Sequence, residues 1–339
     1  MSWDRLRGQE AAKQTFLTAI ERGRLGQAYL LVGPNGVGKR MFARELAKGF
    51  LCSQPPAPMT ACDHCPACTQ VEAGTHPDLL FLRTPEGKHE LPVAAMRVFC
   101  AQLALKPTRG PRKIGIVEDA DDFNEESANS FLKTLEEPPP GALLLLIATD
   151  IGRQLPTILS RCQVVRFGSL SDTDIAAILA EHGVEDSAQR ERLAHLASGS
   201  AARALALTEG SFAEVRKNLI EGLFSPRPDF RFLAETWAKF HDEVGKDKAA
   251  AQRARASLVL QCIIEAVEQA LKLSLGATAT GFDATELAPL KAFANRVGTE
   301  DLLELLDACV EADANVERRV QLILVVESVI EKFTAHRAR

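Results

Sequence analysis

The stretch that decides the fold is "AYLLVGPNGVGKR", residues 28–40, in which a short apolar run leads into a glycine-rich loop. A phosphate-binding loop of the Walker A type has two glycines separated by four residues, followed by Lys and then by Ser or Thr. Gly33, Gly38 and Lys39 fit this pattern, whereas Arg40 stands where the hydroxyl residue belongs. Because that hydroxyl ligates the Mg²⁺ ion of a bound nucleotide, the stretch predicts a P-loop fold with an altered metal site.

Segments typical of strands and helices alternate around this loop. Apolar runs predict strands at residues 28–33, 78–82, 113–120, 142–150 and 163–167. Amphipathic spacing predicts helices at residues 8–22, 40–52, 92–105, 124–137 and 155–162. Strands that alternate with helices form a parallel sheet covered on both faces. We therefore expect an α/β P-loop core over residues 1–168.

The strand signal disappears after Gly168. Capping residues and apolar periodicity predict three short helices, at residues 171–183, 187–197 and 200–208. Further on, long apolar periodicity predicts helices that include residues 251–275 and 318–337. The expected organisation is the core, a three-helix subdomain over residues 169–207 and a helical domain over residues 208–339.

Composition narrows the class of protein. The 339 residues are 46% hydrophobic and 25% charged, and the longest apolar run, "ALLLLIA" at 142–148, has the length of a strand. The start, "MSWDRLRGQE", lacks the apolar segment of a secretory signal, so we expect a cytoplasmic protein. With a formal net charge of −5, any contact with nucleic acid must be a local patch or be shared with partners.

The strand at 113–120 is the candidate for a second nucleotide-site element, the Walker B strand. Walker B strands end in Asp, often followed by Glu, whereas "IGIVED" ends in Glu118 and then Asp119. The reversed order changes the reach of both carboxylates, which matters for in-line phosphoryl transfer. A solvated or helix-capping acidic turn is the alternative interpretation. Together with Arg40, the pair indicates a weakened or inactive hydrolysis site.

Half of the eight cysteines are clustered in the pattern C-x9-C-x2-C-x2-C, formed by Cys52, Cys62, Cys65 and Cys68. Four thiolates close a tetrahedral shell around zinc, and such closed sites are structural. A redox CxxC pair, an iron–sulfur cluster and the exchange of one cysteine for His64 stay open as alternatives. The remaining cysteines lie in apolar surroundings typical of buried thiols: Cys100, Cys162, Cys262 and Cys309.

Two basic features have more than one interpretation. Arg161, in "SRC" at 160–162, is either a surface charge or helix C-cap partner, or a finger that reaches a neighbour's γ-phosphate. The loop "KPTRGPRK" at 106–113 is either solvated or a contact to a phosphate backbone. His76, in "GTHPD", has no spacing typical of a metal ligand or catalytic triad.

Taken together, these motifs resemble the delta-prime family of bacterial DNA polymerase III clamp-loader subunits, which are AAA+ proteins. The resemblance covers residues 1 to about 207. It rests on "GRLGQAYLLVGPNGVGK", the cysteine module, "AGTHPD", "ANSFLKTLEEPP" and "LPTILSRC". The last third is similar only in being helical and in ending with "ANVERRVQLILVVESVI". The resemblance implies an AAA+ core, a three-helix lid and a helical collar that binds other subunits.

The resemblance also implies roles for single residues. Arg161 would be the arginine finger acting in trans, Thr149 would occupy the sensor-1 position, and the four cysteines would bind structural zinc. In the sensor-2 segment "GSAARAL", motor subunits place Arg three residues after Gly, whereas this chain has Ala202 there and Arg203 one position later. ATP or ADP binding to the degenerate loop is possible on this interpretation, and Mg²⁺ is not expected.

These observations favour a stator that does not hydrolyse ATP. Its expected partners are the gamma/tau and delta subunits and, through the complex, the sliding clamp and primer–template DNA. As part of the DNA polymerase III holoenzyme, the chain is expected to have little or no ATPase activity of its own, and nothing after the collar is expected to bind helicase or polymerase. An active gamma/tau-like motor is the main alternative, and a zinc-dependent nucleic-acid-binding module is the third.

Overall fold

The structure is a computed structural model that describes residues 2–85, 88, 90–243, 249–279, 282, 284–318 and 320–335. Its contacts divide the chain into two compact units. The first unit comprises Met1–Val184 with Ser198–Ala202, and the second comprises Glu185–Ala197 with Arg203–Arg339. This division separates the predicted three short helices between the units, and the division into core, lid and collar stays a prediction.

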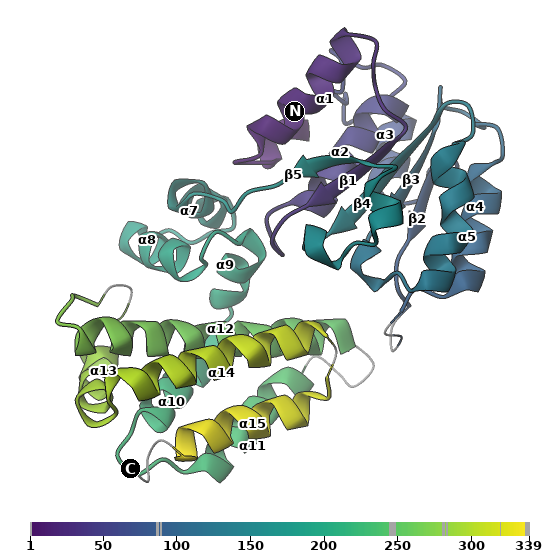
Figure 1. The fold of residues 1–339 in the computed structure, drawn as a ribbon. Coiled ribbons are helices and arrows are strands. Elements are labelled where there is room, and N and C mark those ends of the chain that lie inside the picture. The colour runs from purple at the N-terminus through teal and green to yellow at the C-terminus, as the bar shows by residue number, and fades with distance from the viewer. Residues whose placement is uncertain are drawn as a thin grey trace. The chain divides into compact units, whose positions relative to one another are not determined.

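The first unit is built on one five-stranded sheet in which all neighbouring strands are parallel, in the order β2-β3-β4-β1-β5 (Figure 1). The strands are β1 (Ala28–Val32), β2 (Leu79–Leu82), β3 (Lys113–Val117), β4 (Ala142–Ala148) and β5 (Gln163–Arg166). Every residue of β1, β3 and β4 is buried, as expected for the central strands of a sheet covered on both sides. The predicted α/β core with five strands is confirmed.

Helices from different parts of the chain cover the two faces of this sheet (Figure 1). On one face, Tyr29 and Leu31 of β1 pack with Phe16 of α1 and Phe42 of α2. The opposite face is filled by α4, α5 and α6, through Met96, Phe99, Phe131 and Ile158. Alternation along β1 therefore places the apolar helix surfaces on both sides of the strand that leads into the glycine loop.

The helices of the first unit are α1 (Glu10–Glu21), α2 (Lys39–Leu51), α3 (Pro66–Glu72), α4 (Val93–Leu103), α5 (Glu125–Glu136), α6 (Pro156–Leu159) and α7 (Asp172–Glu181). Three 3-10 turns accompany them: η1 (Ser2–Arg5), η2 (Ala120–Asp122) and η3 (Ile151–Arg153). α5 begins at a capping box between Asn124 and Ser127 and ends two residues before Pro138, which cannot continue a helix.

The second unit is helical throughout its described residues. Its helices are α8 (Ser187–Leu196), α9 (Ala201–Leu207), α10 (Gly210–Leu223), α11 (Phe230–Asp242), α12 (Ala249–Ser274), α13 (Ala284–Arg296), α14 (Thr299–Glu317) and α15 (Leu322–Ala335). The first two residues of α9 belong to the first unit. The helical C-terminal region is thus confirmed. The helix predicted at 318–337 starts later, at Leu322, and residues 336–337 lie outside the described residues.

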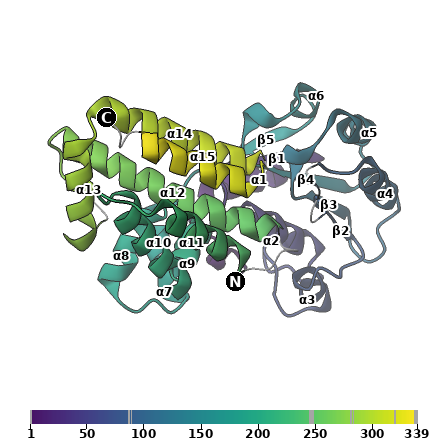
Figure 2. The same ribbon diagram turned by 90° about the horizontal axis from the view of Figure 1, so that it is seen from below.

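The core of the second unit gathers around the long helix α12. α12 and α14 run side by side (Figure 2), and Val259, Ile263 and Val267 of α12 are buried. A cluster of Phe224, Phe293 and Phe333 joins the segments that flank this pair, and Phe224 lies edge-on to both other rings. Within the part of the chain that the structure describes, no helix has both the length and the apolar character to span a bilayer.

Candidate nucleotide and metal sites

The glycine loop has the backbone of a phosphate-binding loop. Gly36 and Gly38 have φ values of +78° and +99°, a region in which side chains other than glycine are strained. Gly33 tolerates no side chain either, because a Cβ atom there would lie 2.3 Å from the carbonyl oxygen of Phe167 in the chain after β5. α2 starts directly after Gly38, so its unpaired N–H groups open toward the loop.

Lys39 is turned toward the loop itself. Its ammonium group donates to the carbonyl oxygen of Gly33 and, at 2.6 Å, to that of Pro34. The side chain is buried, and this desolvation lowers the pKa of Lys39 to about 8 although Asp121 favours the charged form. In this conformation the lysine satisfies loop carbonyls.

Arg40 reaches the acidic pair after β3. Its Nη2 atom lies 3.0 Å from Oδ1 of Asp119, and its Nε atom lies 3.7 Å from Oε2 of Glu118. The residues that depart from the Walker A and Walker B patterns, Arg40 and the pair Glu118 and Asp119, are therefore in contact with one another. The capping alternative does not hold for Asp119, because its side chain makes no cap hydrogen bond at the start of η2.

A third carboxylate, Asp121, completes this edge of the sheet and was missed from the sequence. It accepts hydrogen bonds of 2.7 Å from the backbone N–H of Thr149 and from Nε2 of Gln154. Thr149 at the predicted sensor-1 position is thus held through its backbone, while its buried hydroxyl has no hydrogen-bond partner among the described residues. The acidic run "EDADD" at 118–122 was the available signal for Asp121.

The predicted sensor-2 segment meets the tip of the glycine loop. The carbonyl oxygen of Gly36 accepts from the N–H of Ala201 at 3.0 Å, and a Cβ atom at Gly36 would lie 2.8 Å from Cβ of Ala202. Within the second unit, Arg203 is buried and pairs with Glu265 of α12 at 2.5 Å. The arginine one position late in the motif therefore has a carboxylate partner on α12.

Arg161 lies directly after the short helix α6, where the sequence places it. Its Nε atom donates to Oε1 of Glu136 at the end of α5 at 2.9 Å, and Nη1 donates to the carbonyl oxygen of Thr157 at 2.9 Å. The arginine is thus a C-cap partner of α6, one of the interpretations left open. Glu136 and Arg161 both keep solvent-accessible surface, so this contact lies at the rim of the unit.

The four cysteines converge at the far end of α2. Cys52 follows the last residue of that helix, and Cys65 caps the start of α3. The sulfur atoms all lie within 4.8 Å of one another, with 3.9 Å between Cys52 and Cys65 and 3.9 Å between Cys62 and Cys68. A tetrahedral zinc site with Zn–S bonds of 2.3 Å has sulfur–sulfur edges of about 3.8 Å. The cluster therefore has the dimensions to hold a metal ion.

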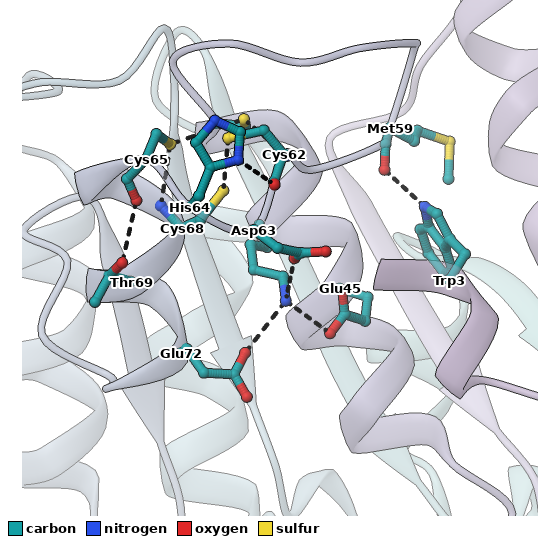
Figure 3. A network of polar contacts seen from close by, with 12 residues as sticks. Trp3, Glu45, Met59, Cys62, Asp63, His64, Cys65, Cys68, Thr69 and Glu72 are labelled. Carbon is teal, nitrogen blue, oxygen red and sulfur yellow. Dashed lines mark hydrogen bonds and ion pairs between the residues drawn. The ribbon is translucent and has the colours of Figure 1, made fainter. Parts of the chain in front are cut away.

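Hydrogen bonds favour the thiolate form of Cys65, whereas burial raises the pKa of Cys52 and of Cys68. The backbone N–H of Cys62 points to Sγ of Cys52 at 3.4 Å, and the N–H of Cys68 points to Sγ of Cys65 at 3.4 Å. Burial alone would raise the pKa of Cys65, but hydrogen bonds from Ser53 and from Cys68 bring it down to about 5. His64 is exposed and its Nδ1 atom contacts the carbonyl oxygen of Cys62 at 2.7 Å, as seen in Figure 3.

The segment that carries the cysteines is fastened to α2 by a buried ammonium group. Nζ of Lys48 lies 3.1 Å from Glu45, 2.9 Å from Asp63 and 3.2 Å from Glu72 (Figure 3). These carboxylates raise the pKa of Lys48 against the effect of its burial. A second tie is the 2.7 Å hydrogen bond from the indole N–H of Trp3 to the carbonyl oxygen of Met59.

The basic loop at 106–113 is organised by an acid that sequence reasoning had not singled out. Asp78 is fully buried and accepts from the backbone N–H groups of Thr108, Arg109 and Gly110 at 2.6–2.8 Å. These bonds lower the pKa of Asp78 although burial opposes the charge. These three N–H groups of the loop are thus satisfied within the protein, and any contact of the loop's side chains with DNA stays a prediction.

The remaining cysteines are apart from the cluster, as predicted. Cys262 and Cys309 are buried and Cys100 and Cys162 half-buried, all as free thiols. Burial raises the pKa to about 12 in Cys162, about 11 in Cys262 and about 12 in Cys309, so these thiols are protonated at neutral pH.

Strand, glycine loop and helix within a parallel sheet define this chain as a P-loop α/β protein. At the position of the hydroxyl residue that ligates Mg²⁺, this chain has Arg40, which pairs with Glu118 and Asp119. Residues 8–171 match the family described as "DNA polymerase III, delta subunit". DNA polymerase III subunit delta' of Bacillus subtilis is 32% identical over 258 residues, which cover 73% of this chain and 77% of that protein. The chain belongs to the delta-prime family of DNA polymerase III subunits.

Other relatives extend this comparison. The delta' subunit of Pseudomonas aeruginosa is 36% identical over 220 residues, 64% of this chain and 67% of the relative. The tau subunit of Escherichia coli is 33% identical over 211 residues, 61% of this chain but 32% of tau. Among solved structures, a gamma-subunit-related protein of Thermotoga maritima aligns over 96% of this chain and 99% of its own, with 16% identity and a TM-score of 0.45.

Proposed function

We propose that this chain is the stator of a DNA polymerase III clamp loader, an AAA+ subunit that does not hydrolyse ATP itself. In this role it supplies Arg161 to the ATP site of a neighbouring motor subunit. The observation that carries the proposal is the contrast between its two arginines. Arg40 is paired with Asp119 and Glu118 of its own candidate nucleotide site, whereas Arg161 lies outside that site and is paired with the half-exposed carboxylate of Glu136.

The contact between Arg161 and Glu136 supports this role because it positions the arginine in an ion pair that a phosphate group can replace. Glu136 keeps half of its side-chain surface exposed, and both carboxylate and guanidinium are therefore accessible to a competing group. A phosphate oxygen is such a competitor, because it accepts the same charge-assisted hydrogen bonds from arginine. In the proposed complex, the neighbour's γ-phosphate takes the place of Glu136.

The proposed partners follow from the relatives. Curated relatives of this chain are named delta', tau and gamma subunits of DNA polymerase III. We propose that the helical second unit joins this chain to gamma/tau and delta subunits, and that the sliding clamp and primer–template DNA are met through the assembled complex.

The absence of self-hydrolysis is tested on the purified chain. We expect negligible release of phosphate from ATP with or without primed DNA, because no hydroxyl ligand for Mg²⁺ stands after Lys39. A DNA-stimulated rate comparable to that of the gamma subunit would instead identify an active motor, the alternative that the intact Gly33, Gly38 and Lys39 keep open.

The role of Arg161 is tested in the complex reconstituted with gamma/tau and delta. An arginine finger acting in trans contributes roughly 10³–10⁵ in rate at the site it serves. Arg161→Ala should therefore silence one ATP site and lower total turnover by at least that site's share, with assembly intact by gel filtration. Arg166→Ala, an exposed position on β5, is the matched control. Equal turnover in both variants would reject the finger assignment.

We further propose that the cysteine cluster binds one structural zinc ion. Four converging sulfurs leave no open coordination position for catalysis. Metal analysis of the purified chain should give about one zinc per chain. Iron with visible absorbance would indicate an iron–sulfur cluster instead.

A further inference from the structure

The residues at the N-terminus of α2 do not fit a divalent metal ion. Mg²⁺ in a P-loop protein needs oxygen ligands in octahedral geometry, one of them the hydroxyl that Arg40 replaces. We propose that Arg40 is a built-in counter-ion that takes the place of this metal, so that the site is complete without a divalent cation and excludes one. The proposal deepens the proposed loss of hydrolysis and is independent of the arginine finger.

The position and the charge of Arg40 are the first support for this proposal. It is the second residue of α2, and its guanidinium crosses to the acidic pair that directly follows β3. The 3.0 Å contact to Asp119 is a charge-assisted hydrogen bond, and the 3.7 Å contact to Glu118 is an ion pair. A single side chain thus gives both carboxylates a positive partner.

The second support is that both carboxylate oxygens of Asp119 and both of Asp121 are already in use. Oδ1 of Asp119 faces Arg40, and its Oδ2 accepts from the backbone N–H of Thr84 at 3.1 Å. Both oxygens of Asp121 accept as well, one from Thr149 and the other from Gln154. An entering cation must displace these donors and approach a guanidinium charge. Both requirements disfavour its binding.

The contacts of Lys39 support the same proposal. In a loop that binds a metal–nucleotide complex, this lysine contacts the β- and γ-phosphates. Here its ammonium group donates to Gly33 and Pro34 of the loop. Both basic residues that follow Gly38 therefore have partners inside the protein, and the site is electrostatically balanced as it stands.

The exposure of Arg40 distinguishes a counter-ion from a structural ion pair. Its side chain is 62% exposed, and ion pairs of such exposed residues contribute little to stability. Removing the charge should therefore change metal affinity without changing the melting temperature. A residue that is merely structural would show the opposite combination.

The test uses Mn²⁺, whose free form is counted by electron paramagnetic resonance, on the zinc-loaded full chain. Arg40→Thr restores the hydroxyl and removes the charge, and we expect it to bind one Mn²⁺ at least tenfold more tightly than the wild type. Arg44→Thr, an exposed position one turn further along α2, is the matched control and should behave as the wild type. Adding Asp119→Asn to Arg40→Thr should abolish the gained site.

Two results would overturn the proposal. One is a wild-type chain that binds Mn²⁺ as tightly as Arg40→Thr and loses it on Asp119→Asn. The other is an Arg40→Thr variant with no gain in affinity. If Arg40→Thr fails to fold, Arg40→Gln keeps a polar, unbranched side chain without the charge and must show the same tenfold gain. Because these measurements use the isolated chain, their failure is distinguishable from a failed Arg161 assay in the reconstituted complex.

Discussion

The two ends of α2 carry different groups that can bind a positive charge. At its N-terminus, the carboxylates of Glu118 and Asp119 meet Arg40, a cation supplied by the protein. Beyond its C-terminus, four sulfurs converge within 4.8 Å of one another. The ammonium group of Lys48 lies 2.9–3.2 Å from the carboxylates of Glu45, Asp63 and Glu72.

On the proposals above, the loop end balances its own charges, whereas the cysteine end depends on a bound metal ion. The loop end needs no metal for its charges to balance, so removing divalent cations should leave it unchanged. At the cysteine end, deprotonated thiols without a metal would repel one another, so folding of that segment and zinc binding are expected to be linked. The predictions below change one end at a time, and each is expected to leave the other end intact.

The largest effect is expected at the cysteine end. Cys65→Ser removes a ligand whose sulfur lies 3.9 Å from that of Cys52, and it should abolish zinc retention and unfold residues 52–72. In small zinc-dependent folds, metal binding contributes roughly 10–16 kcal/mol, so even a fraction of this would dominate the stability of the first unit. Zinc content and thermal unfolding measure the outcome.

His64→Ala is the matched control for this prediction. His64 is exposed and contacts a backbone carbonyl, so its removal should leave about one zinc per chain. Loss of zinc in His64→Ala, with retention in Cys65→Ser, would show that the ligand set has been assigned wrongly.

The cysteine end was also the easier one to predict from the sequence. Its ligands fall within seventeen positions, 52–68, and C-x2-C spacing by itself brings ligands together. The α/β core was predictable for a similar reason, because apolar runs such as "ALLLLIA" read as buried strands without knowledge of their partners.

The loop end required the fold. Arg40 and Asp119 are 79 positions apart, and their contact depends on the order in which β1, β4 and β3 lie in the sheet. The sequence indicated that each residue departs from its motif but not that they neutralise each other. Asp78 escaped notice because backbone N–H groups, which no motif records, are its partners.

The second-largest effect concerns Lys48, which connects the cysteine segment to α2. Lys48→Met removes the ammonium group that is ion-paired with the buried carboxylate of Glu45, and breaking a buried ion pair costs about 3–5 kcal/mol. Replacing both residues, as Lys48→Met with Glu45→Met, should recover part of the loss because both buried charges of this pair are then replaced by apolar side chains. Urea unfolding followed by Trp3 fluorescence in a Trp237→Phe background reports on the first unit. A double variant less stable than Lys48→Met would contradict this account.

A smaller effect is expected at Gly49 of α2, against which the backbone of Met59 packs closely. Glycine to alanine inside a helix normally stabilises by about 1 kcal/mol. At Gly49, however, a Cβ atom would lie 2.2 Å from the carbonyl oxygen of Met59, and relieving such overpacking costs about 1–3 kcal/mol. Gly49→Ala should therefore destabilise the first unit, whereas Gly210→Ala, with open space around it in α10, should not. A stabilising Gly49→Ala would mean that the backbone of Met59 can move away from α2.

The smallest effect lies at the loop end and appears only with pH. The pKa of Lys39 is lowered from 10.5 to about 8 by burial, so between these values the unfolded chain binds a proton that the folded chain has lost. The Lys39 contribution to stability must then rise with pH across this window, by about 1 kcal/mol from pH 8 to pH 9. Lys39→Met lacks this titration, so the wild type should gain about that much relative to it, while below pH 7 the difference should stay nearly constant. If the difference does not change between pH 8 and pH 9, the ammonium group is not desolvated by the loop, and the loop end is less closed than its contacts with Gly33 and Pro34 imply.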